Sequence, residues 1–159
     1  MDEIAAKPTV LAVEAALRAA GITPQIRVLP ETAPTAVAAA QQLGCSVAAI
    51  ANSLIFDAAG APLLVLTSGA HRVDTGKVAA HLGLAKLSRA TAEFVRAHTG
   101  QAIGGVAPLG HPAPIRTLID ESLAAHDEIW AAAGHPHTVF CTTYRELLEA
   151  TGAEAISVN

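Results

Sequence analysis

Two apolar segments of β type, residues 53–56 and 62–67, stand on either side of the short stretch Asp57-Ala58-Ala59-Gly60. Strand-forming runs that are separated by a short loop containing glycine are typical of a β-hairpin. We therefore expect a hairpin at this point of the chain. Because both segments are strongly apolar, the hairpin should begin the core of a sheet.

Helices and strands are expected on both sides of this hairpin, in an irregular order. Helical spacing of apolar residues, N-cap residues and glycine stops predict helices over 8–20, 32–43, 74–81, 91–98 and 143–152. Strands are expected over 25–29, 115–119, 128–132, 137–141 and 155–158. The order lacks the strict βαβ alternation of a doubly wound fold, so we predict an α/β (α+β) fold with a mixed, mainly antiparallel sheet and helices packed on it.

The length of 159 residues fits one domain spanning residues 1–159. Apolar residues make up 52% of the chain but aromatic residues only 3%, so Ala, Val, Leu and Ile must build the core. No apolar run approaches the ~20 residues that a membrane span needs. The start, Met1-Asp2-Glu3-Ile4, has no basic leader. We therefore expect a soluble, cytoplasmic protein that does not contact the membrane.

The net charge of -4 argues against a broad surface that tracks nucleic-acid phosphates, and we expect no DNA partner. Local contact with one nucleic-acid end remains compatible with this charge. The two cysteines, Cys45 and Cys141, lack CxxC spacing and are expected to be buried free thiols.

The segment from Gly104 to His111, Gly104-Gly105-Val106-Ala107-Pro108-Leu109-Gly110-His111, concentrates glycine and proline between a predicted helix and a predicted strand. Glycines allow backbone N–H groups to approach a ligand, and prolines hold a loop in one shape. The spacing fits neither GxGxxG nor the Walker loop, which argues against a nucleotide-phosphate cradle. From the segment alone, a structural turn and a binding site are equal alternatives.

Other polar residues give weaker signals. His135-Pro136-His137 is the tightest histidine pair, but no zinc-ligand spacing surrounds it, and we expect neither a metal nor another cofactor. Ser68 and His71 lie close in sequence without a GxSxG elbow, which disfavours a serine nucleophile. The acidic pairs Asp120-Glu121 and Asp127-Glu128 are expected to be solvated turn charges.

Four stretches, taken together, carry a resemblance to a known family. They are Asn52-Ser53-Leu54-Ile55-Phe56, residues 65–74, residues 103–111 and residues 128–134, with a helix over 92–98 between the second and the third. In this order and spacing the chain resembles, from about 32 to 152, the YbaK-like family, which is the editing domain associated with prolyl-tRNA synthetase and its free-standing relatives.

This resemblance implies a mixed, partly closed sheet with surrounding helices and an aminoacyl-tRNA deacylase. Such an enzyme hydrolyses, in trans, the ester that joins a wrongly attached amino acid to tRNA, with assistance from the substrate itself. A small residue such as Ala on the tRNA for proline is the expected substrate. The implied partner is the 3′ end of aminoacyl-tRNA, and a tRNA synthetase or an elongation factor is a candidate further partner.

The resemblance also implies site residues. The backbone amides of Gly104 and Gly105 would stabilise the oxyanion, and His137 would lie near the substrate. The remaining substrate-binding candidates lie at the end of a predicted strand or in the glycine-rich segment: Ser68, Gly69, His71, Val106, Pro108, Gly110 and His111.

Asn52 departs from the family pattern, in which a Lys commonly begins this strand. An amide can donate a hydrogen bond, but it does not supply a positive charge for a phosphate. Three explanations are open: altered specificity, a substitute cation such as Lys77, Arg72 or Arg116, or loss of catalysis with retained binding of aminoacyl-tRNA.

Overall fold

The predicted hairpin forms the centre of the larger of two sheets in the computed structural model, which describes residues 2–159. Strands β2 (Ala51–Ala58) and β3 (Ala61–Ser68) pair antiparallel over their whole length. The connecting residues Ala59 and Gly60 have φ of 54° and 93°, as a type I′ turn requires. The Asp57 carboxylate accepts a hydrogen bond of 2.7 Å from the Gly60 N–H and fixes this turn.

The strands form a five-stranded sheet in the order β4-β2-β3-β5-β8 and a three-stranded sheet in the order β1-β7-β6. Their bounds are β1 (Ile26–Val28), β4 (Ser88–Arg89), β5 (Arg116–Asp120), β6 (Ile129–Ala132), β7 (Thr138–Thr142) and β8 (Glu154–Ile156). Among the strand pairings of residues 2–159, those of β5 with β3 and with β8 are parallel and the other four are antiparallel, which confirms the mixed, mainly antiparallel α/β class. The structure differs from the expectation in one respect, because the sheets are open and separate rather than one partly closed sheet. A parallel bridge between Ile50 and Trp130 joins them.

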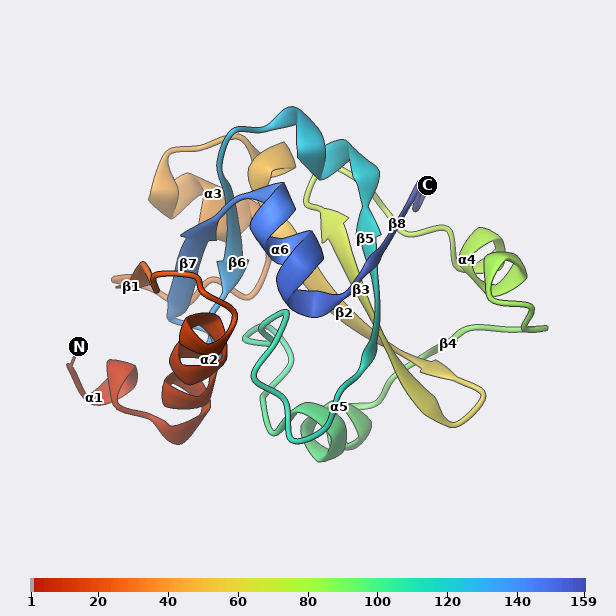
Figure 1. Ribbon diagram of the computed structural model, residues 1–159, viewed down its shortest axis with the longest axis horizontal. Helices are drawn as coiled ribbons and strands as arrows, with labels where there is room; N and C mark the ends of the chain where they lie inside the picture. Colours follow the sequence, from red (N-terminus) through yellow and green to blue (C-terminus); the bar gives the residue numbers. More distant parts are fainter. Residues whose placement is uncertain (1) are drawn as a thin grey trace.

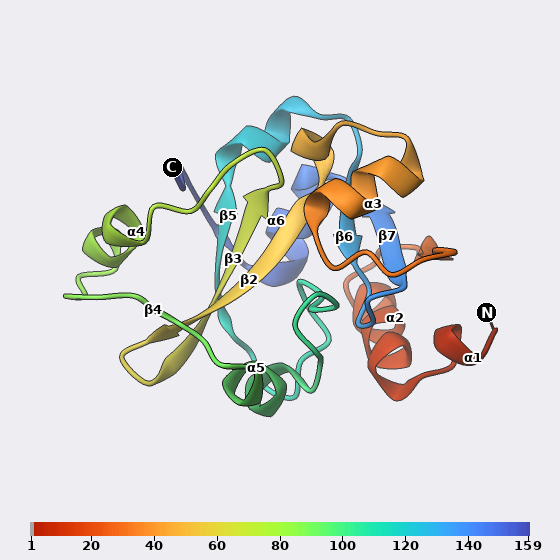
Figure 2. The same cartoon turned by 180° about the vertical axis from the view of Figure 1, so that it is seen from behind.

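The helices surround the two sheets. They are α1 (Asp2–Ala5), α2 (Pro8–Ala19), α3 (Ala36–Leu43), α4 (Thr75–His81), α5 (Ala92–Thr99) and α6 (Tyr144–Thr151), with 3-10 turns η1 (Val47–Ala49) and η2 (Glu121–Ala125). α6 crosses one side of the hairpin (Figure 1), whereas α3 lies on the opposite side and β4 continues the sheet at the edge of β2 (Figure 2). None of the helices in residues 2–159 is long and apolar enough to cross a membrane.

Side-chain caps explain where several helices begin. The Asp74 carboxylate accepts the Lys77 N–H at 3.0 Å, and Thr143 and Glu146 form the predicted capping box. Both helix starts are thereby confirmed. Sequence patterns missed the short elements α1, β4, η1 and η2, which have too few residues to show a period.

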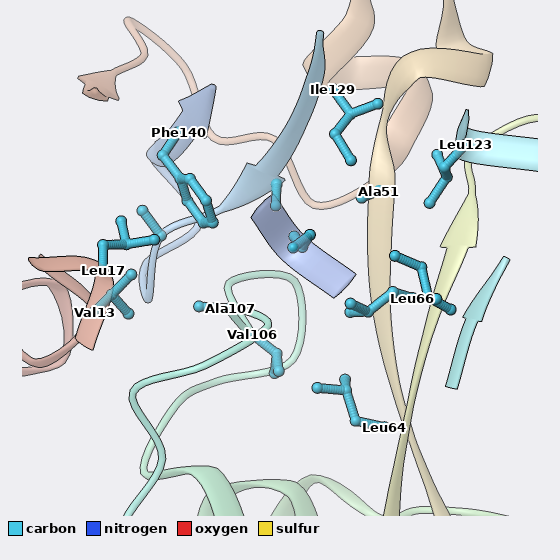
Figure 3. Packing of buried hydrophobic residues seen from close by; sticks show 14 of the residues in the cluster. Val13, Leu17, Ala51, Leu64, Leu66, Val106, Ala107, Leu123, Ile129 and Phe140 are labelled. Carbon is cyan, nitrogen blue, oxygen red and sulfur yellow. The ribbon is translucent and has the colours of Figure 1, made fainter. Parts of the chain in front are cut away.

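The main core fills the space between the sheets, α2 and α6. Figure 3 shows Val106 and Ala107 reaching into it from the glycine-rich segment, between Val13 and Leu17 on one side and Leu64 and Leu66 on the other. A second cluster lies under α4. The large, fully buried side chains are aliphatic apart from Phe140 and Gln101, which confirms the expected aliphatic core.

Both cysteines are free thiols, as expected, although they differ in burial. Cys141 is buried, and burial together with the nearby Glu128 carboxylate raises its pKa to about 11. Cys45 is only partly buried, against α3, and burial raises its pKa as well.

Candidate functional site

A cavity of about 650 Å³ lies along the outer edge of β2. β4 pairs with β2 only at Phe56 and Asp57, so residues 51–55 have no partner strand on this side within the described chain. In an antiparallel ladder, alternate residues direct their N–H and C=O groups toward such an open edge. The cavity is therefore bordered by backbone donors and acceptors that a ligand could use.

Several other parts of the chain contribute to the cavity walls. Pro34 and the first turn of α3 form one wall, Trp130 and Ala132 of β6 form a second, and Ile103 and Gly104 form a third. In Figure 2, α3, β4 and α5 are arranged around the visible edge of β2. The site is thus built from segments that are distant in sequence, and only the fold brings them together.

Gly104 occupies the position in its turn that requires glycine. The Gly105 N–H donates to the Ala102 carbonyl at 2.9 Å, and Gly104, the third residue of this turn, has a φ of 91°. This is the backbone signature of a type II turn. The turn directs Ile103 outward, where it is 60% exposed at the cavity.

The buried side chain of Gln101 joins the start of the same loop to its end. Its buried side-chain oxygen accepts the Ala107 N–H at 2.7 Å, and its backbone N–H is bound by the Thr99 hydroxyl at 3.0 Å. No sequence pattern singled out Gln101, because its role depends on a partner six residues away in an irregular segment.

The two glycines of the predicted oxyanion pair have different surroundings. Gly105 already donates its N–H to Ala102, and a Cβ atom on it would lie 2.8 Å from the His135 carbonyl carbon. No acceptor in the described part of the chain reaches the N–H of Gly104 or of Val106, and both residues line the cavity. Of the residues expected at the site in this loop, Gly104 and Val106 therefore have unpaired amides at the cavity, whereas Gly105 donates its amide within the turn.

Asn52 lines the cavity from β2, opposite Thr67 in the strand register. It is partly buried, and its amide has no hydrogen-bond partner within residues 2–159. A carboxamide offers two donors and an acceptor, so this side chain can serve a ligand at the edge of the sheet.

The charged residues of the cavity lining are Arg72 and Arg89. Arg72 follows the end of β3, and Arg89 lies in β4 opposite Phe56. Sequence reasoning named Arg72 as a substitute cation but missed Arg89, because a two-residue strand gives no recognisable pattern. Of the other two substitutes named, neither Lys77 nor Arg116 lines the cavity.

Ser68, Gly69 and His71 lie at the end of β3, outside the cavity lining. The Ser68 hydroxyl donates to the Ala48 carbonyl at 2.9 Å, and a Cβ atom on Gly69 would lie 2.5 Å from the Val47 carbonyl oxygen. The end of β3 is therefore packed tightly against η1.

Asp120 binds this strand end and corrects one expectation. The prediction that Asp120 is a solvated turn charge is wrong, because the residue is only 1% exposed. Its carboxylate accepts the N–H groups of Ser68 and Ser122, both at 2.9 Å, and lies 2.8 Å from His71 Nδ1. Burial opposes its ionisation, but these hydrogen bonds outweigh burial and lower the pKa of Asp120. The other three members of the two acidic pairs are exposed, as expected.

His137 lies just before the cavity-lining residues Thr138 and Val139 but does not line the cavity itself. Its Nδ1 is 3.0 Å from the Leu29 carbonyl oxygen, which requires a proton on that nitrogen. Its ring stacks on His135, whose pKa is lowered by burial and by the charges of His137 and Lys7. Within the described residues, no three His, Cys, Asp or Glu side chains gather closely enough to hold a metal ion.

Pro108, Gly110 and His111 line a second cavity of about 250 Å³. His111 Nε2 is 2.8 Å from the Ala107 carbonyl oxygen, and burial lowers the pKa of His111. A Cβ atom on Gly110 would lie 3.0 Å from Val13 Cα in α2. The glycine-rich segment thus divides into a first half at the large cavity and a second half packed on α2.

Of the residues expected from the sequence, the structure brings Asn52, Gly104 and Val106 together in the large cavity. The protein is therefore a mixed α/β domain with a cavity between a glycine turn and an open strand edge, where backbone N–H groups can bind a ligand. Comparison with known proteins narrows this class, since the family model described as "Aminoacyl-tRNA editing domain" matches residues 30–150. The chain belongs to this family, and the resemblance noted in its sequence is confirmed.

Individual relatives agree with this assignment. A solved structure described as a proposed trans-editing enzyme for prolyl-tRNA synthetase is 40% identical, with a TM-score of 0.90 over 96% of this chain and 98% of that chain. The hypothetical protein APE2540 is 30% identical, with a TM-score of 0.85 over 92% of this chain and 98% of that one. YwhH of Bacillus subtilis (strain 168), described as uncharacterised, is 30% identical over 112 residues, which are 70% of this chain and 71% of YwhH.

Proposed function

We propose that the large cavity binds the aminoacyl end of a mischarged tRNA and that the protein hydrolyses its ester bond. The observation that carries this proposal is the cavity on the open edge of β2, where the partnerless amides of Gly104 and Val106 lie in the same lining as Asn52. Membership of the editing-domain family supports the same substrate class.

The reaction requires few protein groups, because an aminoacyl ester is already activated. A water molecule adds to the ester carbonyl carbon, and the carbonyl oxygen becomes an oxyanion. The bond from this carbon to the ribose oxygen then breaks, and the ribose oxygen takes up a proton. A neighbouring ribose hydroxyl orients the water in a substrate-assisted reaction, and the products are a free amino acid and uncharged tRNA.

In this scheme Gly104 and Val106 donate their N–H groups to the oxyanion. Gly105 fixes the loop that presents them, since its own N–H is donated within the turn. Asn52 orients the substrate from the opposite wall. His137 acts through the backbone of β7, whose first residues line the cavity.

The cavity wall favours a small, uncharged side chain on the amino acid. Its deeper lining includes Ile55, Val95, Val106 and Ala131, all of which are buried and apolar. Such a wall discriminates by volume, at about 1 to 3 kcal/mol for each methylene. Alanine is the preferred amino acid on this argument, and the tRNA for proline is proposed because the name of one solved relative points to it.

A second function is favoured by one observation, the Asn52 side chain in place of a lysine. A protein that keeps the cavity but lacks the charge would bind aminoacyl-tRNA without turnover. It would then protect or deliver the charged tRNA rather than hydrolyse it. Both functions use the same cavity, and they differ only in whether the ester bond of the bound tRNA is hydrolysed.

The deciding experiment measures ester loss from tRNA for proline charged with Ala, Ser or Cys. We expect faster loss than in buffer, with Ala-tRNA hydrolysed fastest. The variant Ala132→Trp should reduce ester loss to the buffer rate, because Ala132 lines the cavity and is only partly buried. Ala124→Trp, on the exposed surface of η2, is the control. Ester loss at the buffer rate for all three substrates would reject the enzyme and leave the binding protein.

A further inference from the structure

The charge of the cavity is opposite to that of the whole protein. The chain carries a net charge of -4, yet the charged residues that line the cavity are Arg72 and Arg89. Among residues 2–159, no aspartate or glutamate belongs to the lining. A positive site on an acidic protein concentrates anions locally, even though the surface as a whole repels them.

Both guanidinium groups are available to a ligand. Arg72 and Arg89 are exposed, and the ion pairs of the described chain are all formed by other residues. By contrast, the Lys77 ammonium donates to the Ser157 hydroxyl at 3.0 Å and to the Asn159 carbonyl at 2.8 Å. The Lys77 ammonium is therefore already hydrogen-bonded to the C-terminal segment, whereas the guanidinium N–H groups of the two arginines are available to a ligand.

The two arginines approach the cavity from different segments on the β2 side of the sheet. Arg89 is anchored by the pairing of β4 with Phe56, and Arg72 by the connection from β3 to α4. Figure 2 shows both segments on the side of the hairpin where the edge of β2 is visible. The apolar lining and the amides of the glycine turn thus share one cavity with two cations.

We propose that Arg72 and Arg89 bind the phosphodiester groups next to the terminal nucleoside of the tRNA 3′ end. This inference rests on the proposed function, which places the aminoacyl ester in the same cavity. Guanidinium groups bind phosphate through paired N–H donors, and they do so more specifically than an ammonium does. The two arginines supply the positive charge that Asn52 lacks, so the site recognises a charged nucleotide end rather than an aminoacyl nucleoside alone.

The test compares two probes that cannot be hydrolysed, because their amino acid is joined by an amide. One is the trinucleotide CCA with 3′-alanylamino adenosine, which contains phosphodiesters, and the other is 3′-alanylamino adenosine alone, which has none. Calorimetry should show Arg72→Gln and Arg89→Gln each weakening the trinucleotide about tenfold, as the loss of a charged hydrogen bond predicts. Binding of the nucleoside should stay the same. Lys86→Gln and Arg96→Gln, two exposed cations outside the lining, are the matched controls.

Salt provides a second readout of the same contacts. Each lost phosphate contact on a single strand should reduce the slope of log affinity against log salt by about 0.7. The inference is overturned if the wild-type protein binds both probes equally, if it binds neither, or if the arginine variants weaken both probes alike. Arginine-dependent binding of the trinucleotide without hydrolysis of charged tRNA would support the inference while rejecting the proposed enzyme. Hydrolysis of charged tRNA together with arginine-independent binding of the trinucleotide would support the proposed enzyme while overturning the inference.

Discussion

Two groups of polar residues lie at the same end of the hairpin and differ in how their hydrogen bonds are satisfied. At the end of β3, the N–H of Ser68 and the ring of His71, three residues further on, both contact the Asp120 carboxylate. On β2, Asn52 faces the cavity with no partner in the described chain, although it stands directly opposite Thr67. One group is a closed network within the protein, and the other is open to a ligand.

The difference separates residues that stabilise the fold from residues that bind. A buried carboxylate with several donors contributes to stability, because removing it leaves those donors unsatisfied. A partly exposed amide beside a cavity contributes little to stability and keeps its hydrogen bonds for a ligand. Variants in the Asp120 network should therefore lower the free energy of unfolding the most. A variant of Asn52 should lower it the least and should change activity instead.

The largest loss of stability is expected from Asp120→Asn. The substitution removes the charge that binds Ser68, Ser122 and His71 at a site only 1% exposed, at a cost of about 2 to 3 kcal/mol. Urea unfolding followed by circular dichroism would measure it. Glu121→Gln, at the exposed neighbouring position, should change the free energy of unfolding by less than about 0.5 kcal/mol. Equal effects of the two variants would mean that the network around Asp120 does not stabilise the fold.

The same residue predicts a dependence on pH. Burial alone would raise the pKa of Asp120, but its hydrogen bonds lower the pKa in the folded state below the ordinary value. The stabilisation is therefore complete above the ordinary aspartate pKa of about 3.9 and is lost as the pH falls through the lower folded value. Asp120→Asn should unfold with a weaker dependence on pH in this acid range. An unchanged acid profile would contradict the assignment.

An intermediate loss is expected from Gly105→Ala, in the turn that packs against His135 and Pro136. The added Cβ would lie 2.8 Å from backbone atoms of His135 and Pro136, and relieving this overlap should cost about 1 to 3 kcal/mol. Gly76→Ala in α4 is the matched control, because the nearest atom to its Cβ is 3.5 Å away and alanine favours a helix. Thermal unfolding would compare them. A stable Gly105→Ala protein would show that the loop can move away from these residues.

Sequence patterns predicted the hairpin, the long helices and the family, because these depend on local periodicity and on motifs of fixed order. The Asp74 cap and the Thr143 capping box are local signals of this kind. The burial of Asp120 could not be predicted, since an acidic pair after a strand looks the same in sequence whether it faces water or the next strand. The carboxylate is internal because β5 lies next to β3, where Ser68 and His71 contact it.

The candidate site was predicted in part. Asn52, Gly104 and Val106 lie in motifs and were named from the sequence, and the structure places them in one cavity. Arg89 and Gln101 were missed, because Arg89 lies in a two-residue strand and Gln101 in an irregular segment, and neither gives a recognisable pattern. The sequence also treated Gly104 and Gly105 as equivalent, whereas their hydrogen bonds show that only one of these two amides is available.

The smallest change in stability is expected at Asn52. Because its amide has no partner in the described chain, Asn52→Ala should change the free energy of unfolding by less than about 0.5 kcal/mol. The same variant should lower kcat/KM for deacylation about three- to tenfold, the cost of one hydrogen bond to the substrate.

Asn52→Lys should raise kcat/KM if charge limits the reaction at this position, and a deacylation time course measures both variants. A gain from lysine that disappears at high salt would identify phosphate attraction as its cause, because exposed charges are screened by salt. Unchanged activity in Asn52→Lys would instead mean that Arg72 and Arg89 already supply the charge. A large loss of stability in Asn52→Ala would remove the contrast with Asp120 altogether.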